Sequence, residues 1–387
     1  MTAPLRIGFI PLIDAAALIV AVDKGFTAAE GLEVELVREV SWSNVRDKLN
    51  IGLFDAAHLL APVAIASSLG LGHVKVPIAA PFNLGINGNA ITVSPALHAA
   101  LMEQIEGDRF DPLATAKALA KVVAIRRKAG ADPLTFGMTF PFSTHNYQLR
   151  FWMAAAGVDP DEDVRLVVLP PPFMVDSLKS GHIDAFCVGA PWNSIAVDLG
   201  IGHILHFSSD ILVHAAEKVL AVRQVWADKH PDVVASLVRA AVEAAAFIEH
   251  PENRTEAARI LAQPDRIGVD AEVIQRTLDG RLKISPDGAV RESDRYLLVG
   301  REGAGRPDPV QAAWLYAQMV RWGQTALTPD GVKTAMAVFR PDLYDAALGR
   351  QPPAEAPASF GAFAGPAFDP DNIRDHLEAF AVGRWKA

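Results

Sequence analysis

The order of apolar and polar positions repeats between residues 5–62 and residues 134–191. Each segment is predicted to hold a strand, an alanine-rich helix that ends at a glycine, a second strand, a second helix and a third strand. The predicted strands are Leu5–Ile10, Glu33–Val37 and the run that opens at Asp55, and then Leu134–Thr139, Val164–Leu169 and the run that opens at Asp184.

One constant offset, which carries position 5 to position 134, relates the two segments throughout. The identical positions under this offset are Leu5 and Leu134, Gly8 and Gly137, Gly52 and Gly181, Asp55 and Asp184, Ala56 and Ala185, Ala61 and Ala190, and Pro62 and Pro191. Alanine matches arise by chance in an alanine-rich chain. The glycine, aspartate and proline matches fall at the same places within the same order of elements. They indicate two copies of one β-α-β-α-β unit.

Units of this kind have parallel strands with helices packed on the faces of the sheet. Their ligands bind beyond the carboxyl ends of the strands, beside helix N-termini that favour anions. We therefore expect an α/β fold of two lobes, each a mostly parallel sheet flanked by helices, with a ligand cleft between the lobes. A chain of 387 residues suits two such lobes.

From about His214 onward the apolar spacing is helical. The predicted helical stretches are Ala215–Glu249 with a break at Pro231, Pro309–Thr325, Gly331–Phe339 and Asp371–Trp385, and Gln351–Pro370 is predicted to be an extended surface segment. We expect this part to pack on the first lobe. The predicted domains are then 1–90 with 210–387 for the first lobe and 91–209 for the second, with hinges near 85–95 and 200–215.

Composition and charge narrow the classes of partner. A net charge of -9 gives no electrostatic footprint for nucleic acid, although a local cation remains possible. The single cysteine, Cys187, cannot form an internal disulfide, and its apolar run predicts a buried, inert thiol. No secretory signal fits before the first strand, and no run reaches the roughly 20 apolar residues of a membrane helix. We expect a cytoplasmic protein; a signal removed before residue 1 is the alternative.

The sequence carries few signs of catalytic chemistry. The chain has no hydrolase, metalloprotease, paired-thiol or phosphate-loop motif, and its eleven histidines do not cluster at metal-ligand spacing. We expect no catalytic residue, no metal and no cofactor. Asp14 with His145 is the best acid–base pair that can be assembled, and Asp14 is better interpreted as a helix cap.

Six segments carry a family resemblance. They are GFIPLIDAAALIVAVDKGF (8–26), SWSNVRDKL (41–49), NGNAITV (87–93), TFPFSTHNYQLRFWMAAAGVDPDEDV (139–164), VLPPPFMVDSLKSGHIDAFCVGAPWN (168–193) and EKVLAVRQVW (217–226). Together they resemble the nitrate- and bicarbonate-binding, NrtA/CmpA-like branch of the type II periplasmic-binding proteins. The resemblance extends from the start of the chain to about position 260 and continues weakly to FRPDLY (339–344).

The resemblance implies a ligand set. Nitrate binders of this branch hold the ion with a tryptophan, an amide, a histidine and a lysine, and the matching positions are Trp42, Asn89, His145 and Lys218. The amide is glutamine in transport members, so the reach of the shorter Asn89 is open. Several transport members also carry a glutamate at the position of Ala190. The alanine argues against a metal-assisted bicarbonate site.

Each of these residues has a second interpretation. Trp42 lies beside Ser41 and Ser43, either of which could cap a helix, and its ring could serve only for packing. His145 follows Thr144, the expected N-cap, and could be an exposed residue at the helix start.

The other two are as open. Lys218 lies in a largely apolar stretch, where an ammonium needs an anionic partner or must reach solvent. Asn89 follows Asn87 and Gly88 and could be a turn residue.

Three function classes remain. The first, by resemblance to NasS-type sensors, is a cytoplasmic nitrate/nitrite sensor that holds a NasT-type RNA-binding antiterminator inactive until the ion binds. The second is the solute-binding component of an ABC-type importer of nitrate, nitrite or bicarbonate. The third, an enzyme on the same fold, depends on the pair of Asp14 and His145.

Overall fold

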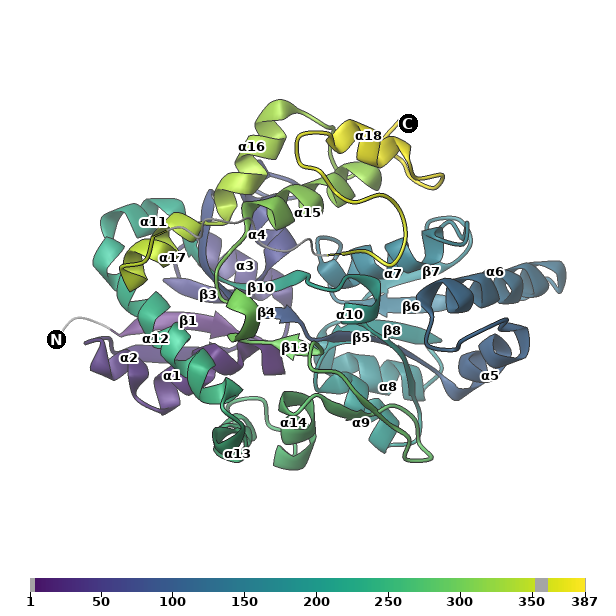
Figure 1. Ribbon diagram of the computed structural model, residues 1–387, viewed down its shortest axis with the longest axis horizontal. Helices are drawn as coiled ribbons and strands as arrows, with labels where there is room; N and C mark the ends of the chain where they lie inside the picture. Colours follow the sequence, from purple (N-terminus) through teal and green to yellow (C-terminus); the bar gives the residue numbers. More distant parts are fainter. Residues whose placement is uncertain (1–3, 352–360, 387) are drawn as a thin grey trace.

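The computed structural model describes residues 4–351 and 361–386 as two α/β lobes placed side by side (Figure 1). The strands are β1 (Leu5–Phe9), β2 (Val34–Arg38), β3 (Ala56–Leu60), β4 (Ile78–Asn87), β5 (Asn89–Val93), β6 (Thr135–Met138), β7 (Arg165–Val168), β8 (Ala185–Gly189), β9 (His203–Phe207), β10 (Ala216–Arg223), β11 (Arg281–Lys283), β12 (Val290–Glu292) and β13 (Leu297–Leu298).

Helices follow most of these strands. They are α1 (Ala16–Asp23), α2 (Phe26–Ala29), α3 (Trp42–Asn50), α4 (Ala61–Leu69), α5 (Pro95–Gln104), α6 (Pro112–Lys128), α7 (Thr144–Ala154), α8 (Met174–Lys179), α9 (Trp192–Asp198), α10 (Ser208–Ile211), α11 (Gln224–Lys229), α12 (Pro231–Glu249), α13 (Arg254–Leu261), α14 (Ala271–Leu278), α15 (Pro309–Arg321), α16 (Pro329–Val338), α17 (Pro341–Leu348) and α18 (Ile373–Glu378), with short 3-10 turns η1 (Ile13–Ala15), η2 (Pro171–Phe173), η3 (Pro251–Asn253) and η4 (Arg301–Gly303). In the described part of the chain, no helix combines the length and apolar character needed to cross a bilayer.

Each lobe is built on one mixed sheet. The first has the strand order β13-β4-β10-β3-β1-β2 and the second β7-β6-β8-β5-β9. The three strands of each repeated unit are parallel to one another, whereas β10 and β5 join them antiparallel. The predicted two-lobed α/β fold with flanking helices is confirmed, and the antiparallel strands are the addition that the repeat alone did not contain.

The first sheet is covered on both faces, as β10 illustrates. Val219 and Ala221 point into one hydrophobic core and Leu220 and Val222 into another, as expected of successive residues in a strand. Helix α4 packs on β10 and β4 within the first core, and α12 packs on β4 and α1 within the second.

The two repeated units match in register as well as in order. Ile7 and Gly8 pair with Ala56 and Ala57, and their counterparts Phe136 and Gly137 pair with Ala185 and Phe186. The carboxylate of Asp55 accepts the N–H of Arg6 at 2.9 Å, and that of Asp184 accepts the N–H of Thr135 at 2.8 Å.

A glycine in the first strand of each unit faces a large side chain. A Cβ added to Gly8 would overlap the ring of Phe54, and one added to Gly137 would lie 2.9 Å from the sulfur of Met174. Close approach to a neighbour, rather than an unusual backbone angle, therefore fixes both glycines.

The chain passes between the sheets twice. It leaves the first sheet after β4 through Gly88, whose φ of 87° suits glycine, and it returns after β9 through α10. These crossings fall within the segments expected to act as hinges. The predicted domain limits and any hinge motion remain predictions.

The C-terminal half corrects one expectation. Residues 216–223 form the buried strand β10, and the helix starts only at Gln224, so the predicted helix over Ala215–Glu249 is wrong in its first part. A short, continuous apolar run fits a buried strand as well as a buried helix, and periodicity does not separate them.

The other predicted C-terminal helices agree with the structure to different degrees. The helices predicted over Pro309–Thr325 and Gly331–Phe339 are α15 and α16, whereas the helix predicted over Asp371–Trp385 covers only Ile373–Glu378. Of the predicted surface segment 351–370, residues 352–360 lie outside the described residues. Helices α15, α16 and α18 cluster at the top of the view in Figure 1.

Candidate functional site

Lys218 occupies the middle of the first sheet, on β10 between β3 and β4. The pairing with β4 is irregular here: Ala216 pairs with Ile86 and Lys218 with Gly85, so Glu217 is an extra residue on β10. A bulge of this kind re-aims side chains. In a regular strand, the side chains of Glu217 and Lys218 would point to opposite faces of the sheet. The bulge explains why the carboxylate of Glu217 and the ammonium of Lys218 lie only 2.9 Å apart.

The ammonium of Lys218 is fully buried and paired twice. Its Nζ lies 2.8 Å from Asp14 Oδ2 and 2.9 Å from Glu217 Oε1, and all three side chains are at most 2% exposed. A buried ammonium is tolerated only with such partners. Burial opposes its charge, yet the two carboxylates outweigh burial and raise the pKa of Lys218. The lysine therefore carries its charge inside the protein, and the interpretation in which it reaches solvent is wrong.

Trp42 begins α3 beside this lysine. Ser41 caps the helix, since its Oγ accepts the N–H of Asn44 at 3.3 Å. The Trp42 ring lies 5.4 Å from Lys218 Nζ and packs edge-on against His58 at 5.3 Å between centroids. Its Nε1 is buried and has no hydrogen-bond partner among the described residues. The ring thus contributes packing, and its N–H remains available as a donor.

His145 lies in the first turn of α7, as expected, but the cap is a different residue. Ser143 Oγ accepts the N–H of Asn146, whereas Thr144 is already helical and donates to the carbonyl of Ala216 at 3.2 Å, so Thr144 as the N-cap was wrong. His145 is fully buried rather than exposed. Burial, followed by the charge of Lys218, lowers its pKa well below the usual value, so the ring is neutral at pH 7.

The two ring nitrogens of His145 differ in their surroundings. Nδ1 lies 3.0 Å from Thr139 Oγ1 and 3.3 Å from Glu217 Oε1. Nε2 is buried without a hydrogen-bond partner in the described part of the chain. Two tautomers fit these contacts: a ring proton on Nδ1 donates to Thr139 or Glu217, whereas a hydroxyl donated by Thr139 to Nδ1 places the ring proton on Nε2, where it can face a ligand.

Asn89 is the first residue of β5 and is fully buried. The left-handed positions that form the turn are Asn87, with φ of 63°, and Gly88. Asn87 and Gly88 therefore form the turn, and the prediction that Asn89 is a turn residue is wrong. Its Nδ2 donates to Glu217 Oε2 at 2.6 Å, while its Oδ1 lacks a partner in residues 4–351 and 361–386.

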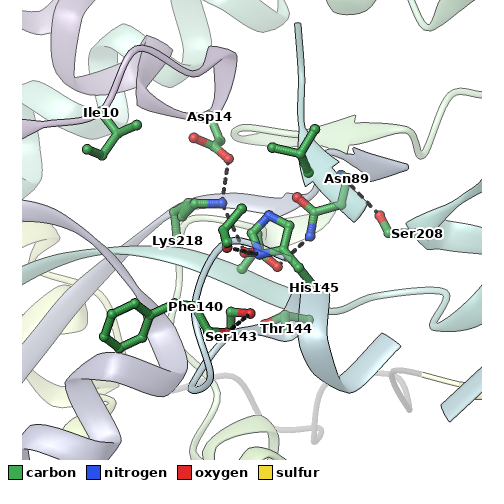
Figure 2. Close-up of polar contacts among 12 residues, drawn as sticks. Ile10, Asp14, Asn89, Phe140, Ser143, Thr144, His145, Ser208 and Lys218 are labelled. Atoms are coloured by element: carbon green, nitrogen blue, oxygen red, sulfur yellow. Dashed lines mark hydrogen bonds and ion pairs between the residues drawn. The ribbon is translucent and has the colours of Figure 1, made fainter. Parts of the chain in front are cut away.

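The four predicted ligand residues therefore converge on one cluster from both lobes: Figure 2 shows Asn89, His145 and Lys218 around a common centre, and the ring of Trp42 lies beside Lys218. Trp42 and Lys218 come from the first sheet and its helix, and Asn89 and His145 from the second. Glu217 joins them because it touches Lys218, Asn89 and His145. Each of the four side chains is at most 1% exposed. Their role as ligands remains a prediction; their proximity is a property of the structure.

Three further residues join the cluster: Asp14, which was considered from the sequence only as a cap or an enzyme residue, and His58 and Glu217, which were not singled out from the sequence. Asp14 makes no cap hydrogen bond, so its interpretation as a cap was wrong; it pairs with Lys218 and, at 2.9 Å, with His58 Nε2. His58 Nδ1 accepts the N–H of Ile10 at 3.4 Å, which leaves the ring proton on Nε2 to bind Asp14. A usable signal was present for Glu217, an acid next to a lysine within an apolar run.

The two acids have opposite electrostatic settings. For Asp14, burial opposes ionisation, but the charge of Lys218 and the hydrogen bond from His58 outweigh it, so its pKa is lowered. For Glu217, burial dominates and raises the pKa, because Lys218 and the amide of Asn89 offset it only in part. Asp14 is the firmly ionised partner of the lysine, and Glu217 is the acid that protonates more easily.

The cluster offers buried donors rather than catalytic groups. Burial raises the pKa of Cys187 well above its usual value, so this thiol is neutral, and it is buried as predicted. Within the described residues, no three His, Cys, Asp or Glu side chains are grouped to hold a metal ion. Asp14, which with His145 formed the acid–base pair considered for an enzyme, is already engaged by Lys218 and His58. The unpartnered indole N–H of Trp42 beside a lysine, together with His145 in the tautomer that is protonated on Nε2, is suited to a small anion.

Comparisons with known proteins agree with the two-lobed fold described above. The model of the NMT1-like family matches residues 1–262. NrtA of Synechococcus elongatus, named a nitrate/nitrite binding protein, is 32% identical over 99% of this chain and 87% of its own length. NrtC of Synechocystis, named a nitrate import ATP-binding protein, is 33% identical over 98% of this chain, which spans only 55% of that relative.

Solved structures support the same conclusion. The crystal structure of the periplasmic nitrate-binding protein NrtA from Synechocystis superposes with a TM-score of 0.88 at 27% identity, over 98% of both chains. The sulphonate-binding protein SsuA of Escherichia coli, at a TM-score of 0.58 and 16% identity, over 89% of this chain and 99% of its own, shares the fold alone. This chain belongs to the NMT1-like family, with the NrtA-type binding proteins.

Proposed function

We propose that this protein is a non-catalytic binding protein for nitrate or nitrite, which it encloses between its lobes beside Lys218. The observation that carries the proposal is the convergence of Trp42, Asn89, His145 and Lys218 from both lobes on one buried cluster. The names of the NrtA relatives support the choice of ion.

The donor set fits a small, flat, singly charged oxyanion. Trp42 Nε1 and His145 Nε2 are buried and without partners in the described residues, and the ammonium of Lys218 is buried beside the Trp42 ring. An anion accepting these N–H groups would satisfy atoms that are otherwise costly to bury. Ala190, in place of the acid of several transport members, removes a carboxylate that could hold a cation for bicarbonate.

A thermal-shift screen tests the proposal. Nitrate, nitrite, bicarbonate and sulfate are added to the full chain, with chloride at equal ionic strength as reference. A ligand that binds only the native state increases the free energy of unfolding, by about 2.7 kcal/mol when the ligand concentration is one hundred times Kd. The melting temperature then rises. Nitrate or nitrite should raise it and sulfate should not. Absence of any shift with both ions would reject the proposal.

We propose further that the binding is used for sensing in the cytoplasm, with a NasT-type antiterminator as the partner. The resemblance to NasS-type sensors supports this role, and the single buried cysteine suits a reducing compartment. The ion would favour the closed lobes and the partner another arrangement, so each would weaken binding of the other by the same factor.

The second candidate is the solute-binding component of an ABC-type importer. The relatives support it, because one is described as periplasmic and another by an import function. The two roles separate by fractionation of cells that express the native gene and by pull-down with a NasT-type protein. A cytoplasmic chain that releases this partner on adding nitrate or nitrite supports the sensor. A periplasmic chain that ignores the partner supports the importer.

A further inference from the structure

The buried cluster pairs one ammonium, Lys218, with two carboxyl groups, Asp14 at 2.8 Å and Glu217 at 2.9 Å. Burial lowers the pKa of the nearby His58 and His145 and raises the pKa of Cys187, so these three groups add no charge at pH 7. With both acids ionised, the net charge of the cluster is minus one. A bound nitrate or nitrite would bring it to minus two inside a region closed to solvent, an arrangement that burial strongly disfavours.

One proton taken up with the ion removes this conflict. Two acids could accept it, and their partners differ. Asp14 is held by Lys218 and by the N–H of His58. Glu217 shares the same lysine, and its other close contacts are the amide of Asn89 and the neutral ring of His145. Glu217 has the weaker support for a negative charge.

Asn89 explains how a protonated Glu217 would be accommodated. With Glu217 ionised, Asn89 Nδ2 donates to it at 2.6 Å and Asn89 Oδ1 has no partner among the described residues. If the carboxyl group carries a proton, the amide can rotate by half a turn, so that Oδ1 accepts the carboxyl O–H and Nδ2 is released. The freed amide then supplies the ion with a donor.

We propose that binding of the anion loads one solvent proton onto Glu217 and thereby turns the Asn89 amide toward the ion. This proposal rests on the proposed function and adds the mechanism that makes binding depend on pH. Protonation of Glu217 thus orients the Asn89 amide, and the affinity for the ion is higher at a pH at which Glu217 can be protonated. Above the pKa of the free Glu217, affinity should fall by up to tenfold for each unit of rising pH.

Calorimetry tests the proton directly. The full chain is titrated with sodium nitrate and with sodium nitrite from pH 6 to pH 8, in Bis-Tris and in Tris, whose heats of ionisation differ. The dependence of the observed heat on the buffer gives the number of protons taken up. The wild type should approach one proton per ion at the upper end of the range, and its Kd should rise with pH.

Three variants complete the test. Glu217→Gln should bind the ion with no proton uptake and a Kd that hardly changes with pH. Glu217→Asp, which keeps an acid, should retain proton uptake. Asp345→Asn is the matched control, because Asp345 is also a buried, ion-paired acid but binds Arg306 outside the cluster; it should behave as the wild type.

The outcomes distinguish this inference from the proposed function. Ion binding by the wild type without proton uptake would overturn the inference and leave the binding function intact. Unchanged proton uptake in Glu217→Gln would overturn it too and point to His145 as the acceptor. If the wild type gave no heat with either ion at any pH, the proposed function itself would fall. A proton count on the wild type does not depend on how well any variant folds.

Discussion

The two repeated units share a scaffold but not a chemistry. Their register, their aspartates at 55 and 184 and their close-packed glycines at 8 and 137 coincide under the constant offset of the repeat. The site residues do not: Asp14 corresponds to Ser143, and His58 to Cys187. The two units therefore share what orders the strands, while each brings different groups to the cluster.

The largest difference is expected at the pair of Asp14 and Ser143. Asp14→Ala leaves the buried Lys218 with one acid, which should lower the free energy of unfolding by about 3–5 kcal/mol. Ser143→Ala removes a helix cap and should cost about 1 kcal/mol. Urea unfolding of both variants measures the difference. Equal losses would mean that Asp14 is only a capping residue, like its counterpart.

The glycines should show a shared sensitivity. Gly8→Ala and Gly137→Ala each force a methyl group into an occupied space, and each should destabilise the fold by about 1–3 kcal/mol, with Gly8 the more sensitive. Thermal unfolding gives the order. As a control, Phe54→Leu should reduce the cost of Gly8→Ala, because it removes the ring that the methyl group meets. Tolerance of both alanines would contradict the packing.

His58 and Cys187 should affect opposite ends of the pH range. Burial lowers the pKa of His58, so its contribution to stability is lost as pH falls below about 6.5, by at most about 1.4 kcal/mol per unit. Burial raises the pKa of Cys187, so its contribution is lost as pH rises above about 8.5.

Chemical unfolding from pH 5 to pH 10 checks both signs. His58→Gln should flatten the acid side of the stability profile only, and Cys187→Ala the alkaline side only. A steeper acid side in His58→Gln would show that the histidine is charged in the native state.

The smallest effects are expected at Asp55 and Asp184. Each carboxylate accepts one backbone N–H at the edge of its unit, so each change to alanine should cost about 1 kcal/mol, with values close to each other. Equilibrium unfolding checks this equality. A large excess for one of them would show that the two units are not held together in the same way.

This contrast also explains what the sequence could and could not predict. The repeat, its strands and the gathering of Trp42, His145 and Lys218 follow from local patterns and from family strings. The sequence predicts a helix where Lys218 lies in a strand, because a continuous apolar run has no diagnostic period. It predicts a capping role for Asp14, because the partner Lys218 lies in the other half of the chain and only the tertiary fold brings the two together.

Titration of nitrate and nitrite into two variants tests whether both units contribute to one anion site. Trp42→Phe keeps a ring but removes the donor of the first unit, and His145→Leu removes the donor of the second. Losing one hydrogen bond to a charged ligand costs about 1.5–3 kcal/mol, so each should weaken binding by about tenfold to a hundredfold. Loss of affinity in both is the predicted result. Full affinity in either variant would place the ion on one lobe alone and contradict a site shared by the two units.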